Sequence, residues 1–553
     1  MRFSLVVLCG GLVLICWCIL AETPVPIRFA ERAIDFELDS CETPQKHAPE
    51  TMAGGVAVFD ANNDGYPDIF FTNGADIVSL KKTGRRYSNR LFLNDGHARF
   101  TDATEKSGLA GTSFDIGVAI GDYDNDGNQD IFVGGVHHNT LYHNNGDGTF
   151  TDVTEQAGLA ASAADSTGPL WSVGGAWVDL NNDGLLDLVI VNYLRWDAAT
   201  EPACNYKETR EYCHPKLYKP SPNQVFLNLG NGKFRDVSQE SGVAAHPGKG
   251  MGIAAADFDL DGRMDLFIAC DKVYNLLFRN TSSGGKVRFE ETAFESNVAL
   301  RENGEFISGM GVDTRDLDND GYPDIALAAL DDETFPIFRN LAAAGRLEFA
   351  DVTRASRMER LSLPMAGYSP TIADFDNDGW KDLFVTRGHV QSLRAAPRVT
   401  VEQPNTVFRN LGGGTFAAFT APGPAARHRG SAVADFNGDG RLDLVVTAIG
   451  APAEIWMNES PGDNHWLALA LEGTRSNRDA IGASVKVVTK SMTQYDHVSS
   501  AAGYASSSAG PLHFGLGKDA RADRIEIRWP SGTTQILTDI VGGKIVRVKE
   551  PAQ

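Results

Sequence analysis

Short apolar runs alternate with glycine- and aspartate-rich turns along most of the chain, and this alternation predicts β-strands. A run such as GVAVF precedes each aspartate-rich turn, and a continuous run such as DLVIV follows it. The second kind, rich in Ile, Val and Phe, is typical of a strand buried on both faces. A third run ends at an asparagine, as in VFLN, and a fourth, such as TFTDVT, follows a glycine turn. The chain therefore repeats a unit of four predicted strands.

The turn between the first and second strands is a nonapeptide, D-x-[DN]-x-D-G-x-x-D. Its copies begin at Asp60, Asp122, Asp179, Asp257, Asp316, Asp374 and Asp435. A period of about 60 residues, with one longer interval after Asp179, is in the range of propellers. We therefore predict an all-β fold: a seven-bladed β-propeller with calcium-binding loops, followed by a small C-terminal β-sandwich domain.

The seventh unit indicates how the ring closes. It lacks a fourth strand after Asn458, whereas IRFAERAIDF near the N-terminus resembles the missing strand. We expect residues 26–36 to complete the last blade, which would leave no open sheet edge. The propeller is then expected over residues 22–463.

An insertion of about 20 residues accounts for the long interval, and it lies between Tyr193 and Gln224. It contains Cys204 and Cys213, and in an exported protein a disulfide between them is the preferred interpretation. Zinc binding with His214 is a weaker alternative. The insertion is either a functional loop or a structural flap.

The first 21 residues combine Arg2, an apolar run and a small residue before polar sequence begins. We interpret residues 1–21 as a secretory signal, with an uncleaved membrane anchor as the runner-up. The protein is therefore expected to be secreted or extracytoplasmic, in the periplasm or at the cell surface. Any membrane contact would come through that anchor alone.

The formal net charge of -22 argues against nucleic acid as a partner, because phosphates would be repelled. The same acidic residues are concentrated in the seven loops. When such a loop curls tightly, the side chains at positions 1, 3, 5 and 9 converge, and glycine at position 6 permits a positive φ. An oxygen cage of this kind suits Ca²⁺.

We predict up to seven structural calcium ions. No His or Cys accompanies the loops to favour zinc or iron, and an EF-hand fails because position 12 is apolar and the flanking sequence is β-like. The predicted ligands at positions 1, 3, 5, 7 and 9, the seventh through its backbone carbonyl, are Asp60, Asn62, Asp64, Tyr66, Asp68, Asp122, Asp124, Asp126, Asn128, Asp130, Asp179, Asn181, Asp183, Leu185, Asp187, Asp257, Asp259, Asp261, Arg263, Asp265, Asp316, Asp318, Asp320, Tyr322, Asp324, Asp374, Asp376, Asp378, Trp380, Asp382, Asp435, Asn437, Asp439, Arg441 and Asp443.

The period disappears from Asn464 onward. Alternating strands separated by glycine and proline turns predict the small β-sandwich over residues 464–553. Within it, TRSNRD from Thr474 to Asp479 is either a functional loop or a hydrogen-bonded turn that braces the sandwich.

The seven loops, together with GTRSNRDAIGA, HFGLG and WPSG in the tail, resemble the FG-GAP/VCBS repeat proteins that end in an ASPIC/UnbV domain. The resemblance implies an exported calcium-binding propeller of the integrin α-subunit kind. Asn62, Asn181 and Asn437 depart from aspartate at position 3, which keeps an oxygen ligand but lowers the charge.

Our leading hypothesis is a non-catalytic adhesion or binding module for an extracellular or surface protein or glycan. The rival is a propeller enzyme, a hydrolase or an oxidoreductase, with its active site in the axial channel or the third-blade insertion. No catalytic residue is predicted, because GxSxG, HExxH and P-loop motifs are missing from the sequence. His137 and His138 are interpreted as ordinary loop residues.

Overall fold

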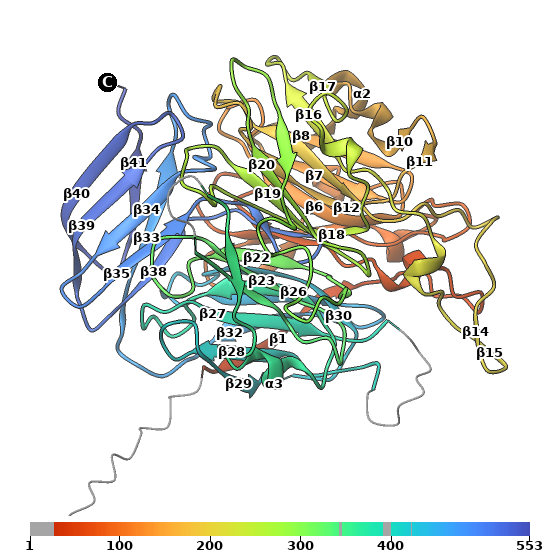
Figure 1. The fold of residues 1–553 in the computed structure, drawn as a ribbon. Helices are drawn as coiled ribbons and strands as arrows, with labels where there is room; N and C mark the ends of the chain where they lie inside the picture. The colour runs from red at the N-terminus through yellow and green to blue at the C-terminus, as the bar shows by residue number, and fades with distance from the viewer. Residues whose placement is uncertain (1–26, 342–345, 391–399, 422, 553) are drawn as a thin grey trace, which may run out of the picture.

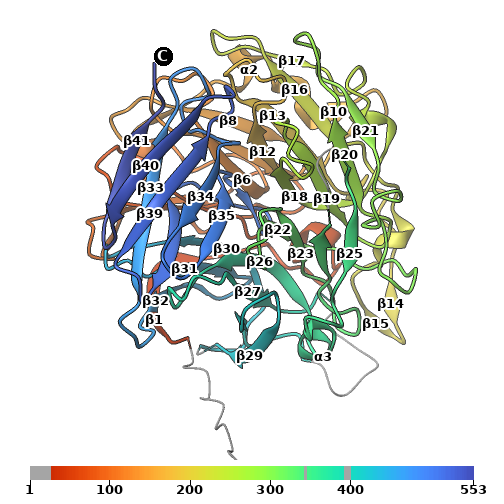
Figure 2. The ribbon, with the colours of Figure 1, turned by 60° about the vertical axis from the view of Figure 1, so that its left-hand side comes forward.

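The computed structural model describes residues 27–341, 346–390, 400–421 and 423–552. Its repeat units form twisted antiparallel sheets that follow one another around a ring, as the colour sequence in Figures 1 and 2 shows. The predicted all-β propeller fold is confirmed. The N-terminal signal or anchor predicted for residues 1–21 lies outside the described residues.

Seven sheets contain one aspartate-rich loop each, always between the first and second strands. In order of their loops they are β2–β5 (Val56–Phe59, Asp68–Phe71, Arg90–Asn94, Phe100–Asp102), β6–β9 (Asp115–Gly121, Asp130–Gly135, Asn139–Asn144, Phe150–Asp152), β12, β13, β16 and β17 (Ser172–Val178, Asp187–Asn192, Gln224–Asn228, Phe234–Asp236), β18–β21 (Gly250–Ala256, Asp265–Cys270, Leu276–Asn280, Phe289–Glu291), β22–β25 (Val312–Arg315, Asp324–Leu327, Ile337–Asn340, Phe349–Asp351), β26–β29 (Gly367–Ala373, Asp382–Arg387, Thr406–Asn410, Phe416–Thr420), and β30–β32 with β1 (His428–Ala434, Asp443–Ala448, Pro452–Asn458, Phe29–Glu37).

The N-terminal strand β1 completes the sheet that contains the seventh loop. It pairs antiparallel to β32, with Phe29 opposite Asn458 and Arg32 opposite Ile455. Phe29 also packs edge-on against Phe375 of the sixth sheet, at 5.5 Å between ring centroids. The two ends of the propeller sequence therefore lie in one sheet.

A buried aspartate joins each sheet to the one before it. In the second sheet, Asp130 accepts hydrogen bonds from the backbone N–H groups of Asn144 (2.8 Å) and Tyr123 (3.2 Å). Asn144 Nδ2 then donates to the carbonyl of Ala61 in the first sheet, at 3.1 Å. The same contacts recur in all seven sheets. Asn94 Nδ2 donates a hydrogen bond to the Phe436 carbonyl at 2.9 Å, and this bond connects the first sheet to the last.

The third-sheet insertion packs against the N-terminal segment. Its hairpin consists of β14 (Asn205–Tyr206) and β15 (Thr209–Arg210), and the predicted Cys204–Cys213 disulfide is present with Cα atoms 5.3 Å apart. Tyr212 Oη donates to Glu42 at 2.9 Å. The insertion is therefore anchored at its base.

Three short helices each follow the fourth strand of a sheet: α1 (Thr104–Ser107), α2 (Thr154–Ala157) and α3 (Met358–Ser362). Two short strands, β10 (Ala164–Asp165) and β11 (Gly168–Pro169), pair with each other. In the described part of the chain, no helix combines the length and apolar character that crossing a bilayer requires.

The C-terminal module consists of two facing sheets, shown in blue in Figure 2. One has the order β38–β33–β41 (Leu512–Gly517, His465–Glu472, Ile545–Lys549), and the other β35–β34–β39–β40 (Thr493–His497, Ser484–Val488, Arg521–Arg528, Thr534–Val541). Leu467, Leu469, Ile525, Ile527 and Trp529 form part of its buried core, as the alternating pattern predicts. Leu471, the next residue of the same alternation on β33, is only partly buried.

A segment of this module leaves the sandwich and enters the centre of the propeller, which the sequence did not indicate. It contains β36 (Ala501–Ala502) and β37 (Ser506–Ser508), and we call residues 501–508 the plug. Ser507 of β37 lies opposite Ala57 of β2 in a parallel pair. Gly503 exchanges backbone hydrogen bonds with Val312 at 2.9 and 3.1 Å.

Glycines immediately before strands β2 and β22 make room for the plug. A Cβ atom on Gly55 would lie 2.6 Å from the Ala505 carbonyl oxygen, and one on Gly311 would lie 2.7 Å from the Gly503 carbonyl carbon. Such contacts are too close for any side chain. The cavity left beside the plug is about 20 Å³, room for about one water molecule. At this level the axis has no space for a substrate, so the axial location that the rival enzyme hypothesis offered is filled by the plug.

Tyr504 is the largest side chain of the plug and is completely buried. It packs edge-on against Tyr368 at 5.2 Å and donates from Oη to the Met52 carbonyl at 2.6 Å. We expect Tyr504→Ala to lower the free energy of unfolding by about 3–5 kcal/mol, since a buried aromatic leaves a cavity. Tyr504→Phe should cost about 1 kcal/mol, the lost hydrogen bond alone. Denaturant unfolding measures both, and equal effects of the two variants would contradict this role.

Candidate metal centre

The first aspartate of each loop sets the curl of the backbone. In the second loop, Asp122 accepts hydrogen bonds from the backbone N–H groups of Asp126 (3.1 Å) and Gly127 (2.8 Å). The other six loops have the same pair of bonds. Gly127 has φ 95°, as the left-handed turn requires. The backbone therefore adopts the tight conformation that the nonapeptide predicts.

Residues at position 7 close the turn through their backbone. The N–H of Asn128 donates to Asp126 Oδ1 at 2.8 Å, and Tyr66, Leu185, Arg263, Tyr322, Trp380 and Arg441 do the same in their loops. Metal coordination by the position 7 carbonyls stays a prediction.

Four of the seven loops bring three acidic ligand atoms within 4.8 Å of one another. The groups, among the described residues, are Asp122, Asp124 and Asp126; Asp257, Asp259 and Asp265; Asp316, Asp318 and Asp320; and Asp374, Asp376 and Asp382. These loops have aspartate at position 3, and we call them Asp-type. The loops at Asp60, Asp179 and Asp435 have asparagine there, and we call them Asn-type. Their aspartates do not form such a carboxylate group in the described structure.

A basic residue of the third strand accompanies every Asp-type loop. Arg279, Arg339 and Arg409 contact the position 3 carboxylates of their loops at 2.5–2.7 Å. The second loop has His143 at the corresponding place, immediately before the buried asparagine. The Asn-type loops have apolar residues at this position, namely Leu93, Leu227 and Met457. When only positions 1, 3, 5 and 9 and the basic residue of the third strand are counted, both types of loop have a formal charge of about −3, with ionised carboxylates and a protonated base.

The Asp-type loops also contain buried oxygen atoms without a hydrogen-bond partner. These are Asp259 Oδ1, Asp318 Oδ1 and Asp376 Oδ1, all at position 3. A buried carboxylate oxygen left unpaired is costly, and a bound cation is one way to satisfy it. The residues present therefore fit an oxygen-preferring divalent ion.

The carboxyl groups at positions 1 and 9 of the loops have raised pKa values because burial and neighbouring negative charges disfavour ionisation. Burial, followed by repulsion from Asp479, raises the pKa of Asp122 to about 8. Burial is the main cause for Asp68 and Asp130, whose pKa values rise to about 7. The carboxylate cluster therefore destabilises the metal-free fold near neutral pH.

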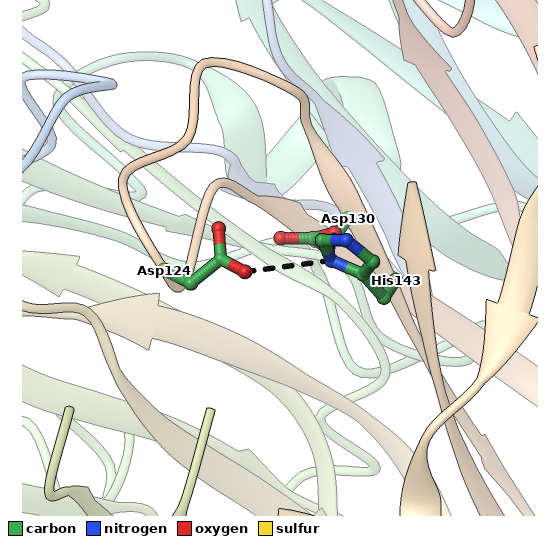
Figure 3. Close-up of side chains that lie close together, drawn as sticks. All are labelled: Asp124, Asp130 and His143. Carbon is green, nitrogen blue, oxygen red and sulfur yellow. Dashed lines mark ion pairs between the residues drawn. The ribbon is translucent and has the colours of Figure 1, made fainter. Parts of the chain in front are cut away.

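His143 corrects the expectation that no histidine accompanies a loop. It belongs to β8, and its Nδ1 lies 3.5 Å from Asp124 Oδ2 and 3.2 Å from Asp130 Oδ1. Figure 3 shows the imidazole beside both carboxylates. The donor set of this loop therefore includes a nitrogen. His143 is the penultimate residue of the third strand of its sheet, β8. Comparing this position among the seven repeats would have identified His143 from the sequence.

The TRSNRD turn contacts the second loop. Asp479 accepts a hydrogen bond from the backbone N–H of Asp122 at 2.8 Å, and the N–H of Arg478 donates to Asn125 Oδ1 at 2.8 Å. Glu550 Oε2 accepts the N–H groups of Thr474, Arg475 and Ser476 at 2.8–2.9 Å. Backbone and Ser531 hydrogen bonds, outweighing burial, lower the pKa of Glu550 to about 2. The turn is therefore a brace that also fixes the module to a loop.

The other candidate residues lie away from the loops. His137 has φ 59°, and its Nε2 lies 2.8 Å from the Trp196 carbonyl, so it joins the insertion to the second sheet. Cys41 and Cys270 are free thiols, the second one buried. His214 caps a short turn by accepting from the N–H of Lys216 at 3.1 Å.

Two family descriptions match the chain. Residues 73–133, 122–190, 217–268, 303–385 and 398–446 match the family described as FG-GAP-like repeat. Residues 473–553 match the one described as ASPIC and UnbV.

The individual proteins to which the chain is similar have low sequence identity to it. Over 517 residues the chain is 25% identical to cartilage acidic protein 1 of Homo sapiens, an alignment that covers 91% of this chain and 72% of that protein. A solved Agrocybe aegerita lectin that recognises non-reducing terminal N-acetylglucosamine has 14% identity and a TM-score of 0.39, with 73% of this chain and 94% of the lectin covered. Bacillus licheniformis rhamnogalacturonan lyase PL11 has 13% identity and a TM-score of 0.35, with 78% and 75% covered. Such low TM-scores say nothing of this chain's ligand.

The raised carboxyl pKa values predict how pH and calcium act together. Between about pH 4 and pH 8 the folded, metal-free protein binds more protons than the unfolded chain, so its stability falls as pH rises. Calcium bound to the carboxylates would replace those protons and should therefore prevent the loss of folding stability as pH rises. We expect the difference in melting temperature between calcium-loaded and chelated protein to widen from pH 5 to pH 8. Calorimetry with magnesium at matched ionic strength is the control, and a constant difference would contradict the prediction.

Proposed function

Because the chain belongs to the FG-GAP-like repeat family and ends in an ASPIC and UnbV domain, we propose that it is an exported calcium-binding β-propeller that serves as a non-catalytic module for binding a protein or glycan. Calcium has a structural role in this proposal, with up to seven ions in the loops. The Cys204–Cys213 disulfide supports an oxidising compartment outside the cytoplasm.

The convergent carboxylates of the Asp-type loops carry the calcium part of the proposal. Each loop has aspartate oxygens held in place by backbone N–H groups, and three of the four leave a buried position 3 oxygen unpaired. Ca²⁺ takes six to eight oxygen ligands, so water and position 7 carbonyls would complete the shell. The Asn-type loops have one carboxylate fewer, and we expect them to bind more weakly.

The position of the C-terminal module favours a binding surface on the side of the ring opposite the aspartate-rich loops. The C-terminal module packs over the aspartate-rich loops, where Trp466 borders Gly440 and Tyr495 borders Gly321. The β14–β15 hairpin projects from the opposite side, as Figure 1 shows. Its tip, at Lys207, Glu208 and Thr209, is exposed. We assign the binding surface to this insertion, because its base is fixed while its tip is accessible.

Calcium stoichiometry tests the metal part. Asp316→Asn combined with Asp320→Asn removes two carboxylates from the fifth loop without changing side-chain size. We expect calorimetric titration to lose one Ca²⁺ per chain, with the remaining sites unchanged. Asp523→Asn, an exposed aspartate of the C-terminal module, is the matched control and should bind like the unmodified protein. Equal calcium binding by the double variant and the control would reject calcium in this loop.

Capture of a ligand tests the binding part. The immobilised full chain is exposed to a glycan array and to the native extracytoplasmic fraction, once with calcium and once with chelator. We expect a ligand that is retained with calcium and released on chelation, and lost when Lys207 and Glu208 are both changed to Ser. Arg524→Ser on the C-terminal module is the control. Retention by the tip variant would place the binding surface elsewhere.

A further inference from the structure

The second loop differs chemically from the other Asp-type loops. Where those loops have an arginine, it has His143, whose Nδ1 is shielded from solvent and has no hydrogen-bond partner. Arg409 Nε and Nη2, by contrast, donate to Asp376 and Asp378 at 2.7 and 2.8 Å. The imidazole instead lies within ion-pair distance of three carboxylates, those of Asp124, Asp126 and Asp130, and is centred between them. Unlike a guanidinium, a neutral imidazole can also be a metal ligand.

The ligand atoms around His143 have the spacing of a metal site. Its Nδ1 lies 3.2 Å from Asp130 Oδ1 and 3.5 Å from Asp124 Oδ2. Around tetrahedral Zn²⁺, with ligands at 2.0–2.2 Å, neighbouring donor atoms lie about 3.4 Å apart. Figure 3 shows the two carboxylates and the ring converging on one region. The nitrogen therefore already lies at the distance from each oxygen that a zinc ion would require, and all three atoms lie within 4.8 Å of one another.

Surrounding residues hold these ligands in place. The Asp130 side chain is fully buried, and two backbone N–H groups fix its oxygens. The other ring nitrogen of His143, Nε2, faces Asp126 Oδ2 at 3.9 Å. Zinc-bound histidines commonly have a carboxylate on the side of the second nitrogen, where it orients the ring.

We propose that the second loop, with Asp124, Asp130 and His143 as ligands, is a transition-metal site that binds Zn²⁺ in preference to Ca²⁺. Calcium selects oxygen donors, whereas imidazole suits zinc and its neighbours in the first transition row. One loop of the ring would thus bind a different ion from the rest. The inference rests on the proposed metal loading of the loops.

Two substitutions within the repeat pattern test the site. His143→Arg gives the second loop the residue of the other Asp-type loops, so its fold and charge should be retained. With Ca²⁺ in large excess, calorimetric titration should show one Zn²⁺ site in the unmodified chain. That site should weaken in the variant by more than the roughly 10–100-fold that loss of an outer-shell partner costs. His97→Arg, an exposed histidine outside the site, is the matched control and should keep it.

NMR of the Co²⁺-loaded protein provides a second readout. An imidazole bound to paramagnetic Co²⁺ gives strongly shifted ring resonances, and His143→Arg should abolish them. The reciprocal Arg409→His should create a second Zn²⁺ site in the sixth loop. Unchanged zinc affinity in His143→Arg, or no new site in Arg409→His, would overturn the proposal. Calcium titration of His143→Arg, in which six loops are intact, reports separately on the proposed calcium binding.

Discussion

The buried aspartate at the ninth position of each loop is the contact on which the ring depends. It accepts the N–H of an asparagine in its own sheet, and that asparagine donates to a carbonyl of the preceding sheet. A carboxylate removed from water is costly unless it is fully hydrogen-bonded, so strand and loop must both keep their positions. Because the contact repeats seven times and closes from Asn94 to Phe436, an error in one sheet affects both neighbours.

The loops and the C-terminal module reinforce each other. The loops keep their acidic side chains close together at the surface that the module covers, and Asp479 adds a further buried carboxylate there. The module in turn inserts the plug, whose backbone pairs with β2 and Val312 on different sides of the axis. Docking of the module and filling of the axis are therefore coupled through shared backbone segments.

Local periodicity predicted much of this fold. Strand order, the loop conformation, the all-β class and the pairing of Cys204 with Cys213 follow from patterns within about 60 residues. The plug could not be predicted in this way, because it depends on contacts between segments hundreds of residues apart. The sequence indicates it only indirectly, through glycines such as Gly55 and Gly311 immediately before β2 and β22. Taken locally, such a glycine indicates only a weak start of a strand. His143 was missed because it lies outside the nonapeptide, one strand further along the chain.

The pairing of β1 with β32 has a consequence for how the chain folds. The first strand of the described chain has no partner until the last repeat, which ends at Asn458, has been made, so the ring cannot close before that point in synthesis. Until then β1 and the edge of β2 are exposed, and such unpaired edges invite association between chains. The plug comes later still in the sequence. Ring closure is thus a late, long-range step with a high loop-closure cost, and it is the stage at which this protein is most exposed to misassembly.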